Sequence, residues 1–331
     1  MKRDIAIFTG QWADLSLPET VKKAREWGYD GLELASWGKH LDIKRALTDH
    51  AYRNEVEATV HEGGLAINAI SNHLVGQAIS DAYIDERHKR MLPSVIWGEG
   101  SSEAIRQRAA ENMKDAARVA AILKVPVVTG FTGSPIWHMI AGWPPIEEND
   151  VSAGYEKFAE QWSPIIDVFD KEGVKFALEV HPSEIAFDYW STKSTLDIMD
   201  WRDGFGINFD PGHLFWQQID LIGYINDFGS RIYHCHGKEA SLHLNGRNGI
   251  MSGLLPFGDL KRGWDFASIG HGEVNWDLLT RALNAINYTG AISVEWDDAH
   301  IDRESAAKEA VKLLKSYNVE RGGSDFQEVF K

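Results

Sequence analysis

Short strand-like runs alternate with longer amphipathic segments along the whole chain, and this alternation constrains the fold more than any other feature. Eight runs are rich in apolar and β-branched residues and are short enough to be strands. We expect these strands at residues 4–9, 31–36, 66–71, 125–131, 175–181, 206–210, 232–237 and 291–296. Helices are expected between them at 19–27, 103–123, 155–171, 195–201, 276–286 and 303–317. Eight such units predict a parallel sheet closed into a single (β/α)8 TIM barrel rather than an open sheet.

No Pro-, Ser- or Gly-rich linker divides the 331 residues, so we expect one catalytic domain at 1–318 and a polar C-terminal tail at 319–331. Gly28, Gly173 and Gly290 fall between a helix and the next strand, where helix C-caps are expected.

Three segments are longer than a barrel needs, namely 73–102 after the third strand, 133–152 after the fourth and 238–272 after the seventh. Because each follows a strand, all three are expected on the catalytic face of the barrel. They are interpreted as walls or a lid over a substrate, with surface decoration or a subunit contact as the alternative.

Composition limits the partners and the compartment. The formal net charge of −15 argues against nucleic acid or an anionic membrane as partner, and favours an unphosphorylated substrate. No run of about 18 or more apolar residues predicts a transmembrane helix, and the start MKRDIAIFTG lacks the apolar core of a signal peptide. The single cysteine, Cys235, excludes an internal disulfide framework, and we expect a cytoplasmic protein.

Four late strands end in side chains that commonly bind metals. KFALEVHP offers Glu179, GINFDPGH offers Asp210 and His213, IYHCHGKE offers His234 and His236, and AISVEWDD offers Glu295, with Asp297 and Asp298 beyond it. An unpaired carboxylate at the mouth of a barrel is costly, and a bound cation is the simplest compensation. Three carboxylates and one imidazole suit Mn²⁺, with Mg²⁺ or Co²⁺ as alternatives.

The two-residue period of a strand narrows the choice between neighbouring candidates. It places His234 and His236 on one side of their strand, and Glu179 and His181 on one side of theirs. His236 lies nearer the C-terminal end and is the preferred ligand, whereas His234 is expected lower in the barrel as a hydrogen-bonded group. Any one of these residues alone could be a satisfied core residue, but repetition at four successive strand ends favours a metal.

The segments LEVHP, NFDPGHL, YHCHGKE, GHGEVNW and SVEW resemble the xylose-isomerase-like superfamily of sugar isomerases and epimerases, and the resemblance covers nearly the whole chain. It implies that Glu179, Asp210, His236 and Glu295 bind Mn²⁺ or a related ion, and that His213 lies near metal and substrate. In the family's ketose epimerases the first and last metal-binding glutamates act as acid and base, so Glu179 and Glu295 are the catalytic candidates. The superfamily also contains dehydratases, lyases and endonucleases. The endonuclease branch has a histidine-rich trinuclear zinc site and a polyanionic substrate, which the net charge and the ligand set disfavour.

Two features bear on the reaction. The family's ketose epimerases usually carry an arginine six residues after the metal histidine, where this chain has Leu242. The loop TGSPIWHMIAGWPP after the fourth strand places His138, an additional acid or base, between Trp137 and Trp143. Together these features resemble the large subunits of deglycosidases that act on 3-oxo-glycosides, including C-glycosides.

That resemblance implies metal coordination by the 3-keto and 2-hydroxyl oxygens, removal of the C2 proton by a glutamate, and loss of the substituent at C1. His138 would manage a proton on the leaving group, Trp137 and Trp143 would hold the aglycone, and His181 and His213 would contact substrate. A small β-rich subunit in a hetero-oligomer is also implied, with a homo-oligomer as the alternative. Two other functions stay open: an aldose–ketose isomerase or ketose epimerase on an unphosphorylated sugar, and a catalytically silent sugar-binding barrel.

Overall fold

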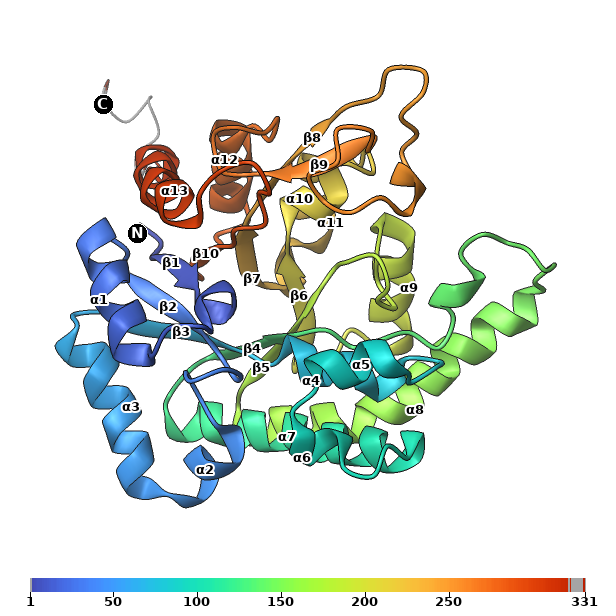
Figure 1. Ribbon diagram of the computed structural model, residues 1–331, viewed down its shortest axis with the longest axis horizontal. Coiled ribbons are helices and arrows are strands. Elements are labelled where there is room, and N and C mark those ends of the chain that lie inside the picture. Colours follow the sequence, from blue (N-terminus) through green and yellow to red (C-terminus); the bar gives the residue numbers. More distant parts are fainter. Residues whose placement is uncertain (1, 321, 323–329, 331) are drawn as a thin grey trace.

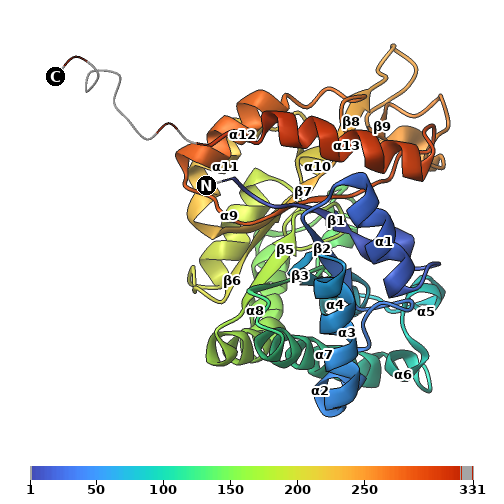
Figure 2. The same ribbon diagram turned by 90° about the vertical axis from the view of Figure 1, so that its left-hand side faces the viewer.

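The computed structural model describes residues 2–320, 322 and 330, and its centre is a closed barrel of parallel strands (Figures 1 and 2). The strands are β1 (Ile5–Phe8), β2 (Gly31–Ala35), β3 (Ala66–Ser71), β4 (Val127–Gly130), β5 (Lys175–Glu179), β6 (Phe205–Phe209), β7 (Ile232–Gly237) and β10 (Ile292–Val294). Successive strands pair side by side, and β10 closes the ring onto β1 with Ile292 opposite Ile5. The predicted single (β/α)8 barrel is confirmed. The expected tail at 319–331 lies mostly outside the described residues.

Helices surround the strands on the outside of the ring (Figure 2). They are α1 (Leu17–Trp27), α2 (Ile43–Thr48), α3 (His50–Glu62), α7 (Ser102–Ile122), α8 (Glu148–Glu172), α9 (Tyr189–Ile198), α10 (Pro211–Phe215), α11 (Leu221–Phe228), α12 (Trp276–Ala285) and α13 (Arg303–Tyr317). None of the helices in the described part of the chain is both long enough and apolar enough to cross a membrane.

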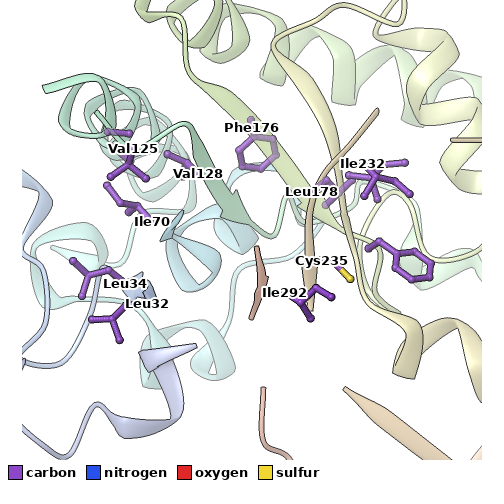
Figure 3. Packing of buried hydrophobic residues seen from close by; sticks show 14 of the residues in the cluster. Leu32, Leu34, Ile70, Val125, Val128, Phe176, Leu178, Ile232, Cys235 and Ile292 are labelled. Atoms are coloured by element: carbon purple, nitrogen blue, oxygen red, sulfur yellow. The ribbon is translucent and has the colours of Figure 1, made fainter. Parts of the chain in front are cut away.

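Side chains of the barrel strands alternate between two environments, and this alternation builds the site. Leu32 and Leu34 of β2 and Cys235 of β7 belong to the large apolar cluster, and Figure 3 shows them among some of its other residues. The alternate residues, Glu33 in β2 and His234 and His236 in β7, are buried, and Glu33 contacts both histidines. Because successive strand side chains point to opposite faces, these polar groups occupy the barrel interior while their neighbours pack outside it.

The three long segments contain secondary structure of their own. The segment after β3 holds α4 (His73–Ser80), α5 (Glu86–Met91) and α6 (Ser94–Trp97), and the one after β4 holds η2 (Trp137–Met139). The segment after β7 forms an antiparallel hairpin of β8 (Glu239–Leu242) and β9 (Trp264–Ala267), which lies beside α10 (Figure 1). The sequence analysis did not predict this hairpin.

Several predicted boundaries were wrong for local reasons. The helix expected at 195–201 begins earlier, at Tyr189, because Asp188 forms a capping box, and it ends at Ile198. Gly28 and Gly173 do terminate α1 and α8 in the left-handed conformation, with φ of 95° and 71°. Gly290 is not a C-cap, because α12 already ends at Ala285 and Gly290 lies in the connection to β10.

Candidate metal centre and substrate cleft

Four neighbouring strands bring Glu179, Asp210, His236 and Glu295 together at the C-terminal mouth of the barrel. One ligand atom from each residue lies within 4.8 Å of the corresponding atoms of the other three. Glu179 ends β5, Asp210 and Glu295 directly follow β6 and β10, and His236 is the penultimate residue of β7. The four side chains named as ligands from the sequence therefore converge on one point.

The donor atoms of this cluster fit a divalent cation. Asp210 Oδ2 and His236 Nδ1 are buried and form no hydrogen bond with any residue that the structure describes, and Glu295 Oε2, which lies 3.0 Å from the Lys238 ammonium, is buried beside them. His236 Nδ1 nevertheless lies 3.0 Å from Glu295 Oε2 and 3.7 Å from Asp210 Oδ2. Buried acceptors without hydrogen bonds are costly, and a cation among them would remove that cost. Three carboxylates and one imidazole nitrogen are a donor set that Mn²⁺ and Mg²⁺ accept.

The electrostatics of the cluster also favour added positive charge. Burial opposes ionisation of Glu179, but the charge of His236 and the hydrogen bonds from His213 and His236 outweigh it and hold the pKa of Glu179 well below its usual range. Burial likewise opposes protonation of His236, yet the surrounding carboxylates, Glu33 first among them, raise the pKa of His236 well above its usual range. A proton and a metal ion therefore compete for this imidazole, and metal binding must weaken at low pH.

Lys238 brings a second positive charge to the cluster, and the sequence analysis assigned it no role. Its Nζ lies 3.0 Å from Glu295 Oε2, 2.6 Å from Asp297 Oδ2 and 3.3 Å from His213 Nε2. The side chain is buried, but the neighbouring carboxylates outweigh that burial and raise the pKa of Lys238 well above its usual range. Strand periodicity could have found it, because residue 238 falls two positions after His236 and therefore on the same side of the strand.

Three further histidines lie around Glu179. His213 Nε2 is 3.2 Å from Glu179 Oε1, and the ring of His181 contacts that of His213 with 4.1 Å between centroids. Both were predicted at the substrate, and both line the cleft over the cluster. His73, which follows β3 and was not predicted, places Nε2 2.9 Å from Glu179 Oε2. The carboxylate of Glu179 is thus fixed in position from several sides.

A cleft of about 670 Å³ opens above the cluster. Glu179, His213, Lys238 and Glu295 form its polar part. Its walls are mainly aromatic and come from the segments after β4, β5, β6 and β7: Trp137, Phe187, Trp216, Phe257, Trp264 and Phe266. Trp216 and Trp264 stack in parallel, with centroids 4.4 Å apart and planes 2° apart. A cleft of this size and character suits a ligand with one polar end and a large apolar end.

His138, predicted to be an additional acid or base, lies outside this cleft, and its catalytic role stays a prediction. Trp137 lines the cleft, but adjacent residues of a 3₁₀ helix point in different directions, and His138 instead contacts Tyr83 in an edge-on arrangement at 5.2 Å. His138 belongs to a separate pocket of about 270 Å³. Trp143, predicted to hold the aglycone, is 77% exposed and is not among the cleft residues of the described chain.

His234 occupies the lower position that strand periodicity predicted. Its Nε2 lies 2.9 Å from Glu33 Oε2 and 2.8 Å from Ser293 Oγ, below the four-residue cluster. Glu33 was missed, because it lies in the middle of β2 and not at a strand end, where the sequence analysis looked for function.

The closed barrel and the carboxylate–histidine cluster at its mouth define a barrel protein with a candidate divalent-metal centre. The chain belongs to the Xylose isomerase-like TIM barrel family, whose sequence model matches residues 21–317. It is also 21% identical to the uncharacterized protein YfiH of Bacillus subtilis (strain 168), over 94% of this chain and 98% of YfiH.

Solved structures share the fold at low sequence identity. The probable 3-DHS dehydratase AsbF from Bacillus anthracis, involved in petrobactin synthesis, matches with a TM-score of 0.66 and 17% identity over 94% of this chain and 98% of AsbF. The 3-keto-D-glucoside 4-epimerase YcjR from E. coli matches with a TM-score of 0.64 and 15% identity, over 95% of this chain and all (100%) of YcjR. A D-psicose 3-epimerase matches with a TM-score of 0.64 and 15% identity over 96% of this chain and 99% of the enzyme.

Proposed function

We propose that this protein is a divalent-metal-dependent enzyme, with Mn²⁺ as the preferred ion, that removes a proton next to the carbonyl group of a keto-sugar. Within that class we propose cleavage of 3-oxo-glycosides by β-elimination. Glu179, Asp210, His236 and Glu295 would hold the cation. The bound cation would polarise the carbonyl and stabilise the negative charge that develops as the proton leaves.

The observation that carries the choice of elimination is the unequal environment of the two glutamates. Glu295 Oε2 is paired with the Lys238 ammonium at 3.0 Å, whereas Glu179 is surrounded by imidazoles, with His213 Nε2 at 3.2 Å. An epimerase moves protons on both faces of one carbon and needs a proton-transfer group on each face. Here the carboxylate on one face is paired with an ammonium, and this arrangement favours proton removal by Glu179 at one atom and expulsion of a group at the next.

The proposed reaction assigns each residue a role at a stated atom. Glu179 takes the C2 proton, and the electrons of the C2–H bond form a double bond between C1 and C2. In an O-glycoside the C1–O bond breaks, its electron pair stays on the aglycone oxygen, and His213 supplies the proton for that oxygen. Lys238 remains charged and stabilises negative charge on the sugar oxygens. The aromatic walls that include Trp216 and Trp264 hold the aglycone and exclude water.

The similar structures support carbonyl-dependent chemistry on polyhydroxylated rings. One is named as a 3-keto-D-glucoside 4-epimerase, and another as a probable 3-DHS dehydratase, an activity that includes an elimination.

The proposal is tested by metal analysis of the purified protein and an assay of a 3-oxo-glucoside of a phenol, with and without EDTA. We expect close to one metal ion per chain, chelator-sensitive phenol release, and recovery when Mn²⁺ is returned. Asp210→Asn should lose both metal and activity, and Glu184→Gln, a buried carboxylate outside the cluster, should lose neither. Phenol release that survives thorough chelation would exclude the metal-dependent mechanism.

The second candidate is an aldose–ketose isomerase or ketose epimerase on an unphosphorylated sugar. The presence of Glu179 and Glu295 in one cluster favours it, as do the epimerases among the similar structures. The two reactions separate in D₂O, because an isomerase or epimerase incorporates deuterium into a recovered sugar without releasing phenol. Free ketohexoses incubated with the Mn²⁺-loaded protein should likewise yield a new sugar only if this second function is correct.

We further propose a cytoplasmic protein whose catalytic unit is 1–318 and whose cleft is completed by another subunit, either a small second chain or a second copy of this one. Large apolar side chains at the cleft mouth support the subunit: Met251 is 81% exposed and Leu254 fully exposed (102%). Light scattering of the purified chain, alone and with candidate partner subunits, tests this part. A stable, fully active monomer would contradict it.

A further inference from the structure

We propose that Glu33 is the positioning residue for His236: it accepts the Nε2 proton and so directs Nδ1 to the other three ligands. This inference rests on the metal centre proposed above. Glu33 is not one of the four proposed metal ligands, and it acts on the centre through His236.

The contacts of Glu33 place its charge directly beneath His236. Glu33 Oε2 lies 3.1 Å from His236 Nε2 and 2.9 Å from His234 Nε2, and Oε1 accepts a hydrogen bond of 2.5 Å from Thr129 Oγ1. The Glu33 side chain is 0% exposed, so no water screens these contacts. A buried carboxylate in such a position needs donors, and the two imidazoles provide them.

The hydrogen-bonding groups of Asn208 are best satisfied with a proton on His236 Nε2. Asn208 Nδ2 is placed 2.9 Å from Nε2, while Oδ1 is buried without a hydrogen bond among the described residues. Turning the amide by 180°, which only exchanges its nitrogen and oxygen, lets Oδ1 accept from Nε2–H, and both neighbours of Nε2 are then acceptors. In the neutral imidazole, the form that binds a metal, the lone pair is then on Nδ1, which faces Glu179, Asp210 and Glu295.

The plane of the His236 ring is fixed as well. Phe8 stacks on it with 5.6 Å between centroids and an interplanar angle of 27°. Ring plane and tautomer are therefore set by residues that hold no metal themselves. Carboxylates that accept from the second nitrogen of a metal-binding histidine fix its tautomer and raise its basicity, and their loss typically costs about 10- to 100-fold in metal affinity.

The test is Mn²⁺ affinity by isothermal titration calorimetry for the wild type, Glu33→Gln and Glu184→Gln. Glutamine keeps the shape of Glu33 and can still accept from His236 through its oxygen, but it removes the charge. We expect Glu33→Gln to weaken Mn²⁺ binding by about 10- to 100-fold. Glu184→Gln is the control for replacing a buried carboxyl group by an amide, because Glu184 is equally buried, accepts hydrogen bonds at both oxygens and contacts no histidine in the described chain. Since the pKa of Glu184 is raised to about 8, this control removes little charge near neutral pH, whereas Glu33→Gln removes the charge beneath His236.

A second measurement needs no variant at Glu33. In the wild type loaded with diamagnetic Mg²⁺, histidine ¹⁵N spectra should show the His236 resonance, identified by its loss in His236→Gln, as the Nε2–H tautomer. Equal Mn²⁺ affinity of wild type and Glu33→Gln, or an Nδ1–H tautomer in the loaded wild type, would overturn the inference. Absence of Mn²⁺ binding by the wild type would instead overturn the proposed metal centre, so the two failures are distinguishable.

Discussion

Lys238 Nζ and Asp297 Oδ2 lie 2.6 Å apart, and this pair fixes a buried ammonium at the edge of the metal centre. Asp297 has a side chain that is 35% exposed, so it joins the buried cation to the open cleft. The pair leaves the ammonium able to contact a substrate oxygen as well as Glu295, at 3.0 Å. Each prediction below follows from contacts of this kind.

Lys238→Met should lower kcat strongly while the protein still binds Mn²⁺. Lys238 Nζ lies 4.5 Å from the centre of the Phe266 ring, and methionine can fill the same space against this ring but removes the charge that the proposed mechanism uses to stabilise negative charge on the substrate. The expected loss in kcat is about 10²- to 10³-fold, the usual cost of removing one such stabilising group. Steady-state kinetics and metal analysis check it together. An unchanged kcat with normal metal content would show that Lys238 serves the structure alone.

Asp210→Asn should reduce both Mn²⁺ content and thermal stability in the presence of Mn²⁺. Asp210 Oδ2 faces the other ligand atoms, while Oδ1 accepts from Gly212 N at 2.7 Å and starts α10, so asparagine can keep the cap and lose the ligand charge. At a metal concentration of about 100 times Kd, the wild type should gain roughly 2.7 kcal/mol in unfolding free energy. Melting curves with and without Mn²⁺ measure this gain, which the variant should lack.

His138→Ala should leave activity nearly unchanged, in contrast to the role that the sequence predicted for this histidine. The side chain lies outside the cleft and contacts Tyr83. We expect kcat/KM within about twofold of the wild type, equivalent to less than about 0.5 kcal/mol of transition-state stabilisation. A loss of several orders of magnitude would mean that the loop of η2 closes over the substrate and carries His138 with it.

Glu184 should make the protein less stable as the pH rises. Burial and the nearby charge of Asp81 raise the pKa of Glu184 from 4.5 to about 8. Between these values the unfolded chain has lost the proton and the folded chain keeps it. The unfolding free energy therefore falls with increasing pH, by at most about 1.4 kcal/mol per unit. The free-energy difference between wild type and Glu184→Gln, from urea unfolding across this range, should shift in favour of the variant. A constant difference would contradict the raised pKa.

The barrel and the grouping of the four candidate ligands were predictable because both depend on regular features of the strands. Strand–helix alternation predicted eight strands that the structure contains. The period of two placed His234 and His236 on one side of β7, and the position of His236 nearer the C-terminal end distinguished it from His234. Lys238 obeys the same rule and could have been predicted from it. The role of Glu33 could not be predicted in this way. It depends on a contact between β2 and β7 across the barrel interior, and these two strands are far apart in sequence.

Loop residues were the hardest to predict. The orientations of His138 and Trp143 depend on the path of the segment after β4. Hydrophobic periodicity does not predict the path of such a loop. The main aromatic wall came instead from the hairpin β8–β9 and from the end of α10, where Trp216 and Trp264 meet. Their spacing of 48 positions along the chain gives no sign of that contact.

Hydrogen bonds hold the hairpin β8–β9 at its base, and the base is remote from the tip. Glu239 accepts hydrogen bonds from Gly270 N at 2.9 Å, Gly272 N at 2.8 Å and Trp276 Nε1 at 2.6 Å, and it points away from the side on which Lys238 lies. The span 243–263 can therefore change in length and sequence while the base stays in place and the reactive groups keep their positions. Natural variation or directed evolution confined to this span can therefore change which apolar groups the cleft accepts while the residues of the candidate metal centre stay the same.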